Sequence, residues 1–139
     1  MTVLAWDGKT LAADKQITFG GTPVPCTKIF RVEDALIGCT GEAQEGLSFV
    51  AWWKAGCPDP KPEFKEGFCA LVVRNNKLWK YENMLVSILI DMPCWGAGSG
   101  ADYAIGAMAA GKNAAEAVEI ACRFDVSCGL GIDTLTLEG

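Results

Sequence analysis

The chemistry open to this chain is limited first by a residue type that it lacks. None of its 139 residues is a histidine. A Ser-His-Asp or Cys-His mechanism therefore cannot be built within the chain, and a histidine-ligated metal site is excluded as well. An enzyme of this composition that works near neutral pH needs another base. A free α-amino group, whose ordinary pKa is roughly 7.7 to 8.0, is one candidate.

Thr2 is the residue that could use such a base. Its hydroxyl is a poor nucleophile by itself and needs a neighbouring group to take its proton. If Met1 is removed, Thr2 carries both the hydroxyl and a free α-amine, and the lack of a leader before Met1 fits this hypothesis because extra residues would block the amine. The plainer interpretation is a strand residue after a common start, and position alone favours it.

Composition narrows the remaining functions. The formal net charge is −5 and no Lys/Arg cluster occurs, so nucleic-acid binding has little support. No apolar run approaches the ~20 residues of a membrane helix, and no secretory signal is recognisable. We therefore expect a cytoplasmic protein with free thiols. The number of cysteines is odd, they are scattered along the chain, and no two of them form a C-x-x-C pair. The seven are Cys26, Cys39, Cys57, Cys69, Cys94, Cys122 and Cys128.

Hydrophobic periodicity predicts the elements that would position such a site. Alternating or continuous apolar runs predict strands at 2–6, 9–13, 17–19, 28–32, 35–39, 68–73, 77–81, 85–90 and 132–137. Three-to-four spacing predicts helices at 42–55 and 101–110, and a third from the Asn113 cap to about residue 124, with Glu116 in a capping-box position. Asp7-Gly8 and Asn75-Asn76 predict the turns of two β-hairpins. The order suits an α+β fold in one domain over 1–139, with two antiparallel sheets face to face and helices outside.

Four segments, taken in order, resemble the β-subunits of proteasomes and the bacterial peptidase HslV, which are N-terminal nucleophile (Ntn) hydrolases of the threonine type. They span nearly the whole chain, and their order makes the match more specific than any one of them. They are Thr2-Val3 through Leu11-Ala12-Ala13-Asp14, then Thr27-Lys28-Ile29-Phe30, then Ile37 to Gln44 (IGCTGEAQ), and Gly98-Ser99-Gly100 with the Ala-rich helix and Arg123 to Gly129 (RFDVSCG) behind it. The resemblance implies a four-layer αββα sandwich.

The resemblance also implies a role for each matching residue. Thr2 would be the nucleophile and its α-amine the general base. Lys28 would lie under the nucleophile and favour the neutral amine, and Asp14 would compensate the buried ammonium. From the residues alone, Asp14 could equally end a strand with a turn bond, and Lys28 could be an exposed lysine, as we expect for Lys15.

Four further positions match the family pattern. Gly38 would supply a backbone N–H to the oxyanion hole, and Ser99 and Asp125 would lie beside the threonine amine. Cys128 stands where the family has serine, and a thiol is a weak donor. The alternatives are tight strand packing for Gly38, a helix cap for Ser99, and a solvated turn for Asp125.

The function that the resemblance implies is a threonine-type endopeptidase with no cofactor, acting on peptides or unfolded proteins. It further implies a homo-oligomeric ring and leaves room for an ATP-dependent unfoldase partner. Two alternatives stay open: an Ntn hydrolase of small amides, and a non-catalytic ring-forming or binding subunit. The middle of the chain favours the latter, because the family's second long helix is reduced to the proline-rich segment 57–63.

Overall fold

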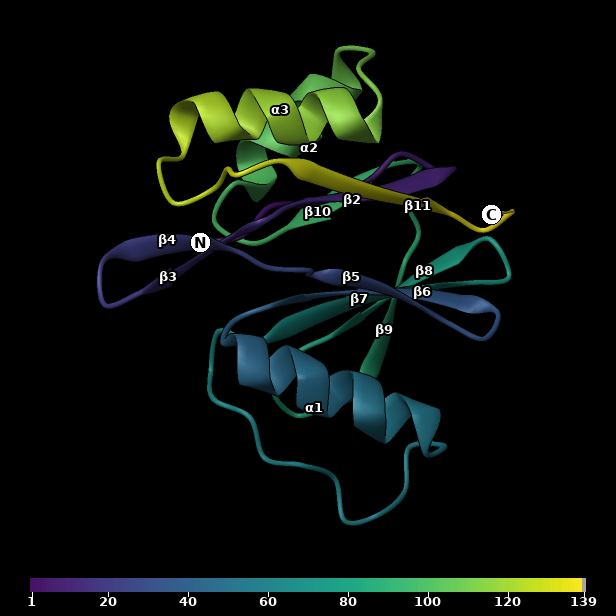
Figure 1. Ribbon diagram of the computed structural model, residues 1–139. Helices are drawn as coiled ribbons and strands as arrows, with labels where there is room; N and C mark the ends of the chain where they lie inside the picture. Colours follow the sequence, from purple (N-terminus) through teal and green to yellow (C-terminus); the bar gives the residue numbers. More distant parts are fainter. Residues whose placement is uncertain (139) are drawn as a thin grey trace.

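The structure is a computed structural model, and it describes residues 1 to 138. Two β-sheets face each other in the middle of the molecule, and helices cover their outer faces (Figure 1). Helices α2 (Ala101–Ala109) and α3 (Ala114–Phe124) lie on one side, and α1 (Ala43–Lys54) lies on the other. The predicted α+β arrangement of antiparallel sheets and outer helices is therefore confirmed.

The first sheet carries both ends of the chain. It has four antiparallel strands in the order β10-β1-β2-β11. Their bounds are β1 (Leu4–Trp6), β2 (Thr10–Asp14), β10 (Trp95–Ala97) and β11 (Ile132–Thr136). The predicted hairpin around Asp7-Gly8 joins β1 to β2, and Gly8 takes a φ of 94° there. Strand β10 was not predicted, because three residues that include a glycine give no periodic pattern.

The second sheet has five antiparallel strands in the order β5-β6-β7-β8-β9. Their bounds are β5 (Ile29–Val32), β6 (Ala35–Thr40), β7 (Cys69–Arg74), β8 (Lys77–Tyr81) and β9 (Ser87–Ile90). The predicted turn at Asn75-Asn76 joins β7 to β8. Both asparagines have positive φ, 54° and 59°, as a two-residue hairpin turn requires.

A separate two-stranded hairpin projects beyond both sheets (Figure 1). It consists of β3 (Gln16–Phe19) and β4 (Thr22–Pro25), joined at Gly20-Gly21. The first of these strands was predicted, but β4 was not, because alternating prolines disfavour a strand assignment. Proline lacks the backbone N–H that donates to a neighbouring strand, and it is therefore tolerated on edge strands. Both strands of a two-stranded sheet are edge strands, so β4 can contain Pro23 and Pro25.

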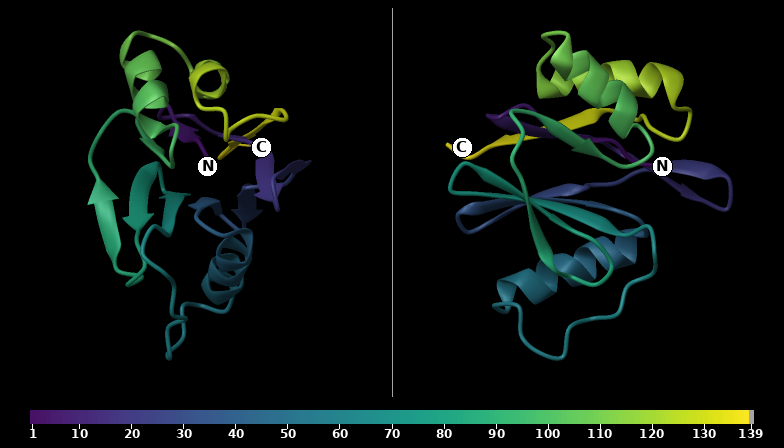
Figure 2. Two further views of the ribbon diagram at one scale, coloured as in Figure 1. Left: turned by 90° about the vertical axis from the view of Figure 1, so that its left-hand side faces the viewer. Right: turned by 180° about the vertical axis from the view of Figure 1, so that it is seen from behind.

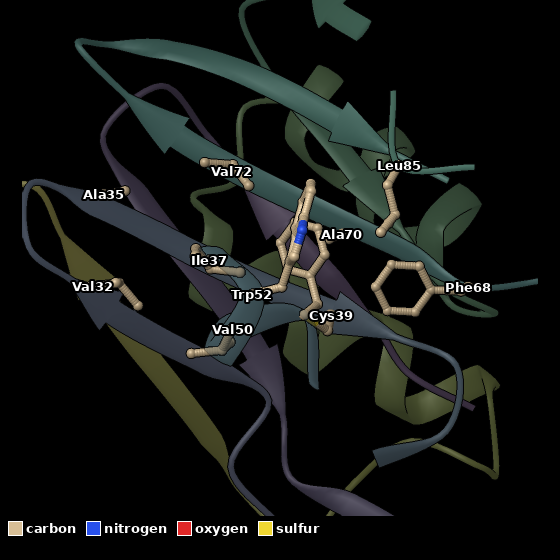
Figure 3. Close-up of a cluster of buried hydrophobic side chains, with 11 residues drawn as sticks. Val32, Ala35, Ile37, Cys39, Val50, Trp52, Phe68, Ala70, Val72 and Leu85 are labelled. Carbon is tan, nitrogen blue, oxygen red and sulfur yellow. The ribbon is translucent and has the colours of Figure 1, made fainter. Parts of the chain in front are cut away.

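Three apolar clusters hold the layers together. The cluster between the sheets includes Leu4, Leu11, Leu36 and Leu71, all fully buried. The cluster under α2 and α3 consists mostly of alanines and small residues, which lets helices approach the sheet closely. The cluster under α1 is aromatic: Phe49 packs against Trp52, Phe68 and Tyr81. Figure 3 shows Trp52 and Phe68 among the buried side chains of this cluster.

The helix boundaries follow local signals in the sequence. Asn113 caps α3 and forms the predicted capping box with Glu116. No described residue from 55 to 68 is helical, so the segment after α1 is an irregular loop where the resemblance places a second long helix. Within residues 1 to 138, no helix has the length and apolar character needed to cross a bilayer.

Candidate active site

Thr2 lies two residues before β1, with 6% of its surface exposed. Its Oγ1 accepts a hydrogen bond of 3.2 Å from the Lys28 ammonium. Lys28 comes just before β5 in the opposite sheet, so the contact depends on how the two sheets face each other. The structure thus brings the predicted nucleophile and the predicted lysine together.

Asp14, at the end of β2, is the partner that the Lys28 charge requires. Its Oδ1 lies 2.9 Å from Lys28 Nζ, and both side chains are buried, at 0% and 8% exposure. A buried ammonium without a counter-ion is costly, whereas a paired one is tolerated. Lys15, by contrast, forms a half-exposed ion pair with Asp133, as expected for a surface lysine.

Backbone N–H groups complete the surroundings of the Asp14 carboxylate. Val3 donates to Oδ1, and Gln16 and Gly129 donate to Oδ2, each at 3.1 Å. Hydrogen bonds to a carboxylate stabilise its charged form. Among the described residues, no buried side-chain nitrogen or oxygen lacks a partner. The carboxylate is therefore fixed in position, and it fixes the Lys28 ammonium in turn.

The Gly98-Ser99-Gly100 segment holds the backbone of Thr2. Gly100 N donates to the Thr2 carbonyl at 3.1 Å. A Cβ on Gly98 would lie 2.7 Å from the Thr2 carbonyl carbon, and Gly98 has a φ of 92°, a conformation that other residues rarely adopt. Only glycine therefore lets the loop approach Thr2 this closely. The sequence marks the motif, but it does not reveal which glycine contacts Thr2.

Ser99 and Asp125 form a second polar group at the nitrogen of Thr2. Thr2 N donates to Ser99 Oγ at 3.3 Å, and Ser99 Oγ donates to Asp125 Oδ2 at 2.6 Å. Partial burial disfavours the ionised form of Asp125, but hydrogen bonds from Ser127, Ser99 and Cys128 outweigh it and hold the pKa of the carboxyl well below its usual range. An ionised Asp125 makes Ser99 a donor toward it, which leaves the Ser99 lone pairs to accept from the nitrogen of Thr2.

Cys128 joins this second group as predicted, through weak contacts. Its Sγ lies 3.4 Å from Asp125 Oδ2 and 3.9 Å from Ser99 Oγ. Burial, with Asp14 nearby, raises the pKa of the thiol to about 12. Cys128 is therefore a neutral thiol and a weak donor, where a serine would give a strong hydrogen bond.

Ser127 is a member of the group that sequence reasoning missed. Its N–H and its hydroxyl both bind Asp125 Oδ1, at 3.0 and 2.5 Å. These bonds leave Asp125 Oδ2 facing Ser99. A short run of a carboxylate followed two residues later by serine is the usual pattern of such a turn, so a local signal was present.

Gly38 lies in the middle of β6, opposite Ile29 on one side and Leu71 on the other. A Cβ at this position would come within 3.1 Å of Leu4 and Ile29 side chains, so the glycine allows the two sheets to pack closely. Gly38 lines neither of the two cavities that border Thr2. Its predicted donation to an oxyanion stays a prediction.

Met1 occupies the space next to these groups. Its carbonyl accepts from Lys28 Nζ at 3.2 Å and its amine donates to Ser99 Oγ, while its side chain is 76% exposed. The groups that would act on Thr2 are therefore also able to bind the residue before it.

Two cavities meet at Thr2. One, of about 630 Å³, has mostly apolar walls that include Ile17, Phe19, Phe30 and Leu47. The other, of about 610 Å³, has a mixed lining that includes the charged residues Glu45, Lys65, Glu66 and Lys80. Within residues 1 to 138, no group of three or more cysteine and acidic side chains is arranged to hold a metal ion.

Comparison with known proteins gives matches in structure alone. No family model matches the sequence, and no curated protein matches it. The chain is similar to BPH of Thiobacillus denitrificans, both in complex with epoxomicin (TM-score 0.76, 20% identity, 97% of each chain covered) and by itself (TM-score 0.74, 19% identity, 97% and 96% covered).

A third match is HslV from Trypanosoma brucei, with a TM-score of 0.72, 20% identity, and 97% and 98% of the two chains covered. The chain has the proteasome-like Ntn fold of these proteins. The resemblance found in the sequence is thereby confirmed at the level of the fold.

Proposed function

We propose that the chain is a threonine-type peptidase that uses Thr2 as its N-terminal nucleophile once Met1 has been removed. The observation that carries the proposal is the buried contact of Thr2 Oγ1 with Lys28, which Asp14 holds in place. A hydroxyl bound to a fixed ammonium is stabilised as it loses its proton. Proteins with this fold include HslV, so the fold and the site favour the same chemistry.

The first half of the reaction forms an acyl-enzyme. The free α-amine of Thr2 takes the proton from Thr2 Oγ1, and the oxygen attacks the carbonyl carbon of an amide bond. The C–N bond then breaks as the protonated amine gives its proton to the departing nitrogen. Ser99 accepts from the backbone N–H of Thr2, and after removal of Met1 the same contact would hold one N–H of the free amine and orient the amine's lone pair away from Ser99.

The second half releases the acyl group. Water attacks the ester on Thr2 Oγ1, with the same amine as base, and the carboxylic acid leaves as the hydroxyl is restored. The negative oxygen formed in each half needs a preorganised donor. We keep the N–H of Gly38 as the predicted donor, and no cofactor takes part in this scheme.

The cavities favour a peptide over a small amide. The larger one is apolar, and its volume of about 630 Å³ lies in the range of sites that enclose drug-sized ligands. The second cavity also borders Thr2, and its lining includes the charged residues Glu45, Lys65, Glu66 and Lys80. A chain that crosses Thr2 could bury a side chain in the first cavity and extend through the second, as a peptide or unfolded segment would. A small amide would leave most of this space empty.

A non-catalytic function is the second candidate, and Met1 favours it. The carbonyl and the amine of Met1 satisfy Lys28 and Ser99. If Met1 is retained, Thr2 has no free amine and the site has no base. The chain would then serve as a structural or binding subunit with the same fold. A ring of identical copies, an ATP-dependent unfoldase partner and a cytoplasmic location belong to the peptidase proposal.

The first test combines intact mass with epoxomicin, the compound bound to the BPH of T. denitrificans. We expect the purified protein to lack one methionine and to gain the mass of epoxomicin on incubation. Thr2→Ala should remove both the adduct and the hydrolysis of peptide amides. Thr2→Ser keeps a hydroxyl and an amine, and should retain measurable activity.

Three outcomes would count against the proposal. Peptide hydrolysis by folded Thr2→Ala would exclude Thr2 as the nucleophile. A retained Met1 would favour the non-catalytic function. Hydrolysis of small acyl amides without hydrolysis of peptides would assign the same chemistry to the other substrate class.

A further inference from the structure

Residues 55–67 form an irregular segment that we call the strap. In Figure 1 it runs along the bottom of the molecule, from the end of α1 back to the start of that helix, before the chain enters β7. The right view of Figure 2 shows the same course from behind. Most residues of the strap are exposed, so burial of apolar surface contributes little to holding it in place. Its position therefore depends on specific contacts.

Two contacts hold the first part of the strap. Trp52 Nε1 donates to the Pro58 carbonyl at 2.9 Å, and Lys61 Nζ donates to the Leu85 carbonyl at 3.4 Å. None of these residues lines either cavity beside Thr2. These contacts therefore fix the course of the strap, and another group must hold its end near the site.

Glu45 holds the end of the strap. Its Oε2 accepts from the backbone N–H of Lys65 at 2.9 Å, and its Oε1 accepts from the backbone N–H of Glu42, the N-cap of α1, at 3.4 Å. The Lys65 side chain adds an ion pair with Glu42, but the two side chains are exposed by 76% and 47%, and exposed ion pairs contribute little. The half-buried carboxylate of Glu45 is therefore the main tie.

The segments that Glu45 joins meet at the turn between β6 and α1. A Cβ on Gly41 would lie 3.3 Å from Phe68 Cα and 3.4 Å from Glu45 Oε1, so the end of the strap packs directly against this turn. Gly41 and Glu42 line both cavities of the candidate site. Glu45 and residues 65–67 line the second cavity. The end of the strap is therefore a wall of the second cavity, and the turn lies between the two cavities.

We propose that Glu45 is a positioning residue: it holds the strap against the Gly41 turn, and the end of the strap then forms the wall that a peptide substrate contacts in the second cavity. Glu45 acts through the strap and does not touch the reacting atoms. The role toward the substrate rests on the proposed peptidase function, whereas the tie between Glu45 and the strap can be tested without any substrate.

The competing explanation is that Glu45 only caps α1. A glutamate at the third position of a helix commonly accepts from the N-cap backbone, and its charge suits the positive end of the helix dipole. The chain offers a matched control for this effect. Glu116 holds the same position in α3, accepts from Asn113 N at 3.0 Å, and lines neither cavity. Glu116→Ala therefore removes a helix cap and leaves the strap untouched.

Amide hydrogen exchange measures the tie directly. In Glu45→Ala the backbone N–H of Lys65 loses its charged acceptor, so we expect its exchange to become about tenfold faster or more. The same amide should exchange at the wild-type rate in Glu116→Ala. Unchanged exchange of the Lys65 amide in Glu45→Ala would overturn the tie.

Two peptides with the same cleaved bond test the role toward the substrate. One extends by several residues before the bond and ends in a small amide, and the other carries a small acyl group before the bond and extends after it. Only one half of a chain that crosses Thr2 can enter the second cavity. We expect Glu45→Ala to raise KM by about 3–10-fold for that peptide alone, with kcat unchanged. Glu116→Ala should leave both peptides unaffected.

The remaining results would overturn the proposed role. Equal losses for the two peptides would indicate general damage to the fold, and no loss for either would show that the substrate does not contact this wall. If circular dichroism shows that Glu45→Ala is unfolded, Glu45→Gln carries the same comparison, because it keeps one of the two acceptor oxygens.

Failure of the peptidase proposal gives a different result. A wild type that cleaves neither peptide would count against peptidase activity and leave the exchange measurement unaffected. Fluorescence anisotropy of the same two peptides, labelled at one end, then replaces KM. Weaker binding of one peptide to Glu45→Ala would support the wall, and binding of neither peptide to the wild type would overturn it.

Discussion

Two groups of polar side chains reach Thr2, and they differ in burial and in the elements that carry them. Asp14 and Lys28 are at most 8% exposed and lie at the ends of strands in opposite sheets. Ser99 and Asp125 are partly exposed and lie in the loops at the ends of helices α2 and α3. Strand ends between packed sheets have little freedom to move, whereas loops can adjust. The first group therefore combines stability with chemistry, and the second can be changed at a smaller cost to the fold.

Among the variants of the two groups, Lys28→Ala should have the largest effect on stability and on peptide hydrolysis. It leaves the Asp14 carboxylate buried without its counter-ion, which should lower the free energy of unfolding by about 3–5 kcal/mol. Peptide hydrolysis should fall by about 10²–10³-fold, because the hydroxyl of Thr2 loses its charged donor. Urea denaturation and peptide hydrolysis assays measure the two effects.

Lys15→Ala is the matched control for that variant. It breaks the half-exposed pair with Asp133, so it should cost about 0–1 kcal/mol and leave hydrolysis unchanged. Equal losses in the two lysine variants would contradict the distinction drawn between the buried and exposed charges.

Gly98→Ala should have the next largest effect on stability. It pushes a methyl group against the Thr2 carbonyl, at a φ that alanine rarely adopts. We expect a loss of at least about 1–3 kcal/mol in unfolding free energy from the backbone strain alone. Gly106→Ala is the control, because Gly106 lies inside α2 with open space around its Cβ position. This variant should gain about 0.5–1 kcal/mol in free energy of unfolding. Thermal unfolding measures the stability of both variants. A Gly98→Ala variant as stable as the wild type would contradict the close approach of Gly98 to the Thr2 carbonyl.

Ser99→Ala separates chemistry from stability. The hydroxyl is partly exposed, so its loss should cost only about 1 kcal/mol. Hydrolysis should fall by about 10²-fold, because the Thr2 amine loses the acceptor that orients it. Ser127→Ala offers a comparison, since its hydroxyl binds the far oxygen of Asp125 and should cost less activity. A Ser99→Ala enzyme with full activity would place the amine under the control of other groups.

Asp125→Asn should have the smallest effect, and one that depends on pH. The folded-state pKa of Asp125 is lowered, against burial, by hydrogen bonds from Ser127, Ser99 and Cys128, so its charged form stabilises the fold above the ordinary carboxyl pKa near 3.9. That stabilisation is lost as pH falls through the folded-state value. The free energy of unfolding of the wild type should exceed that of the variant by about 1 kcal/mol or less at pH 7. This difference in stability should shrink below about pH 4. A gap that widens in acid would contradict the assigned shift.

Local sequence signals predicted most of the fold. The Asn75-Asn76 turn and the Asn113–Glu116 capping box each depend on residues close in the chain, and both were predicted correctly. Strands β4 and β10 were missed because their own sequences carry no strand pattern. They are strands because they pair with β3 and β1. The α+β arrangement followed from the order of elements, but the choice of this fold among others needed the resemblance.

The site divides in the same way. Thr2, Asp14 and Lys28 could be named from residues and resemblance, and the structure brings them together. The contact of Gly98 with the Thr2 carbonyl could not be named, because it joins residues 96 positions apart that only the folded sheet brings together. The N–H of Gly129 on Asp14 is a similar case. Backbone donors leave no mark in the sequence, since every residue except proline has one.

The bonds of Asp14 have a consequence for the order of events during synthesis. The carboxylate joins Val3, Lys28 and Gly129, and the last of these lies 115 residues away along the chain. Contacts of such sequence separation form late, after the intervening chain has closed. A nascent chain that ends before residue 129 therefore exposes Thr2 without its organised surroundings. If Thr2 is the nucleophile proposed above, the growing polypeptide is in this way protected from hydrolysis by its own site until residue 129 has been added.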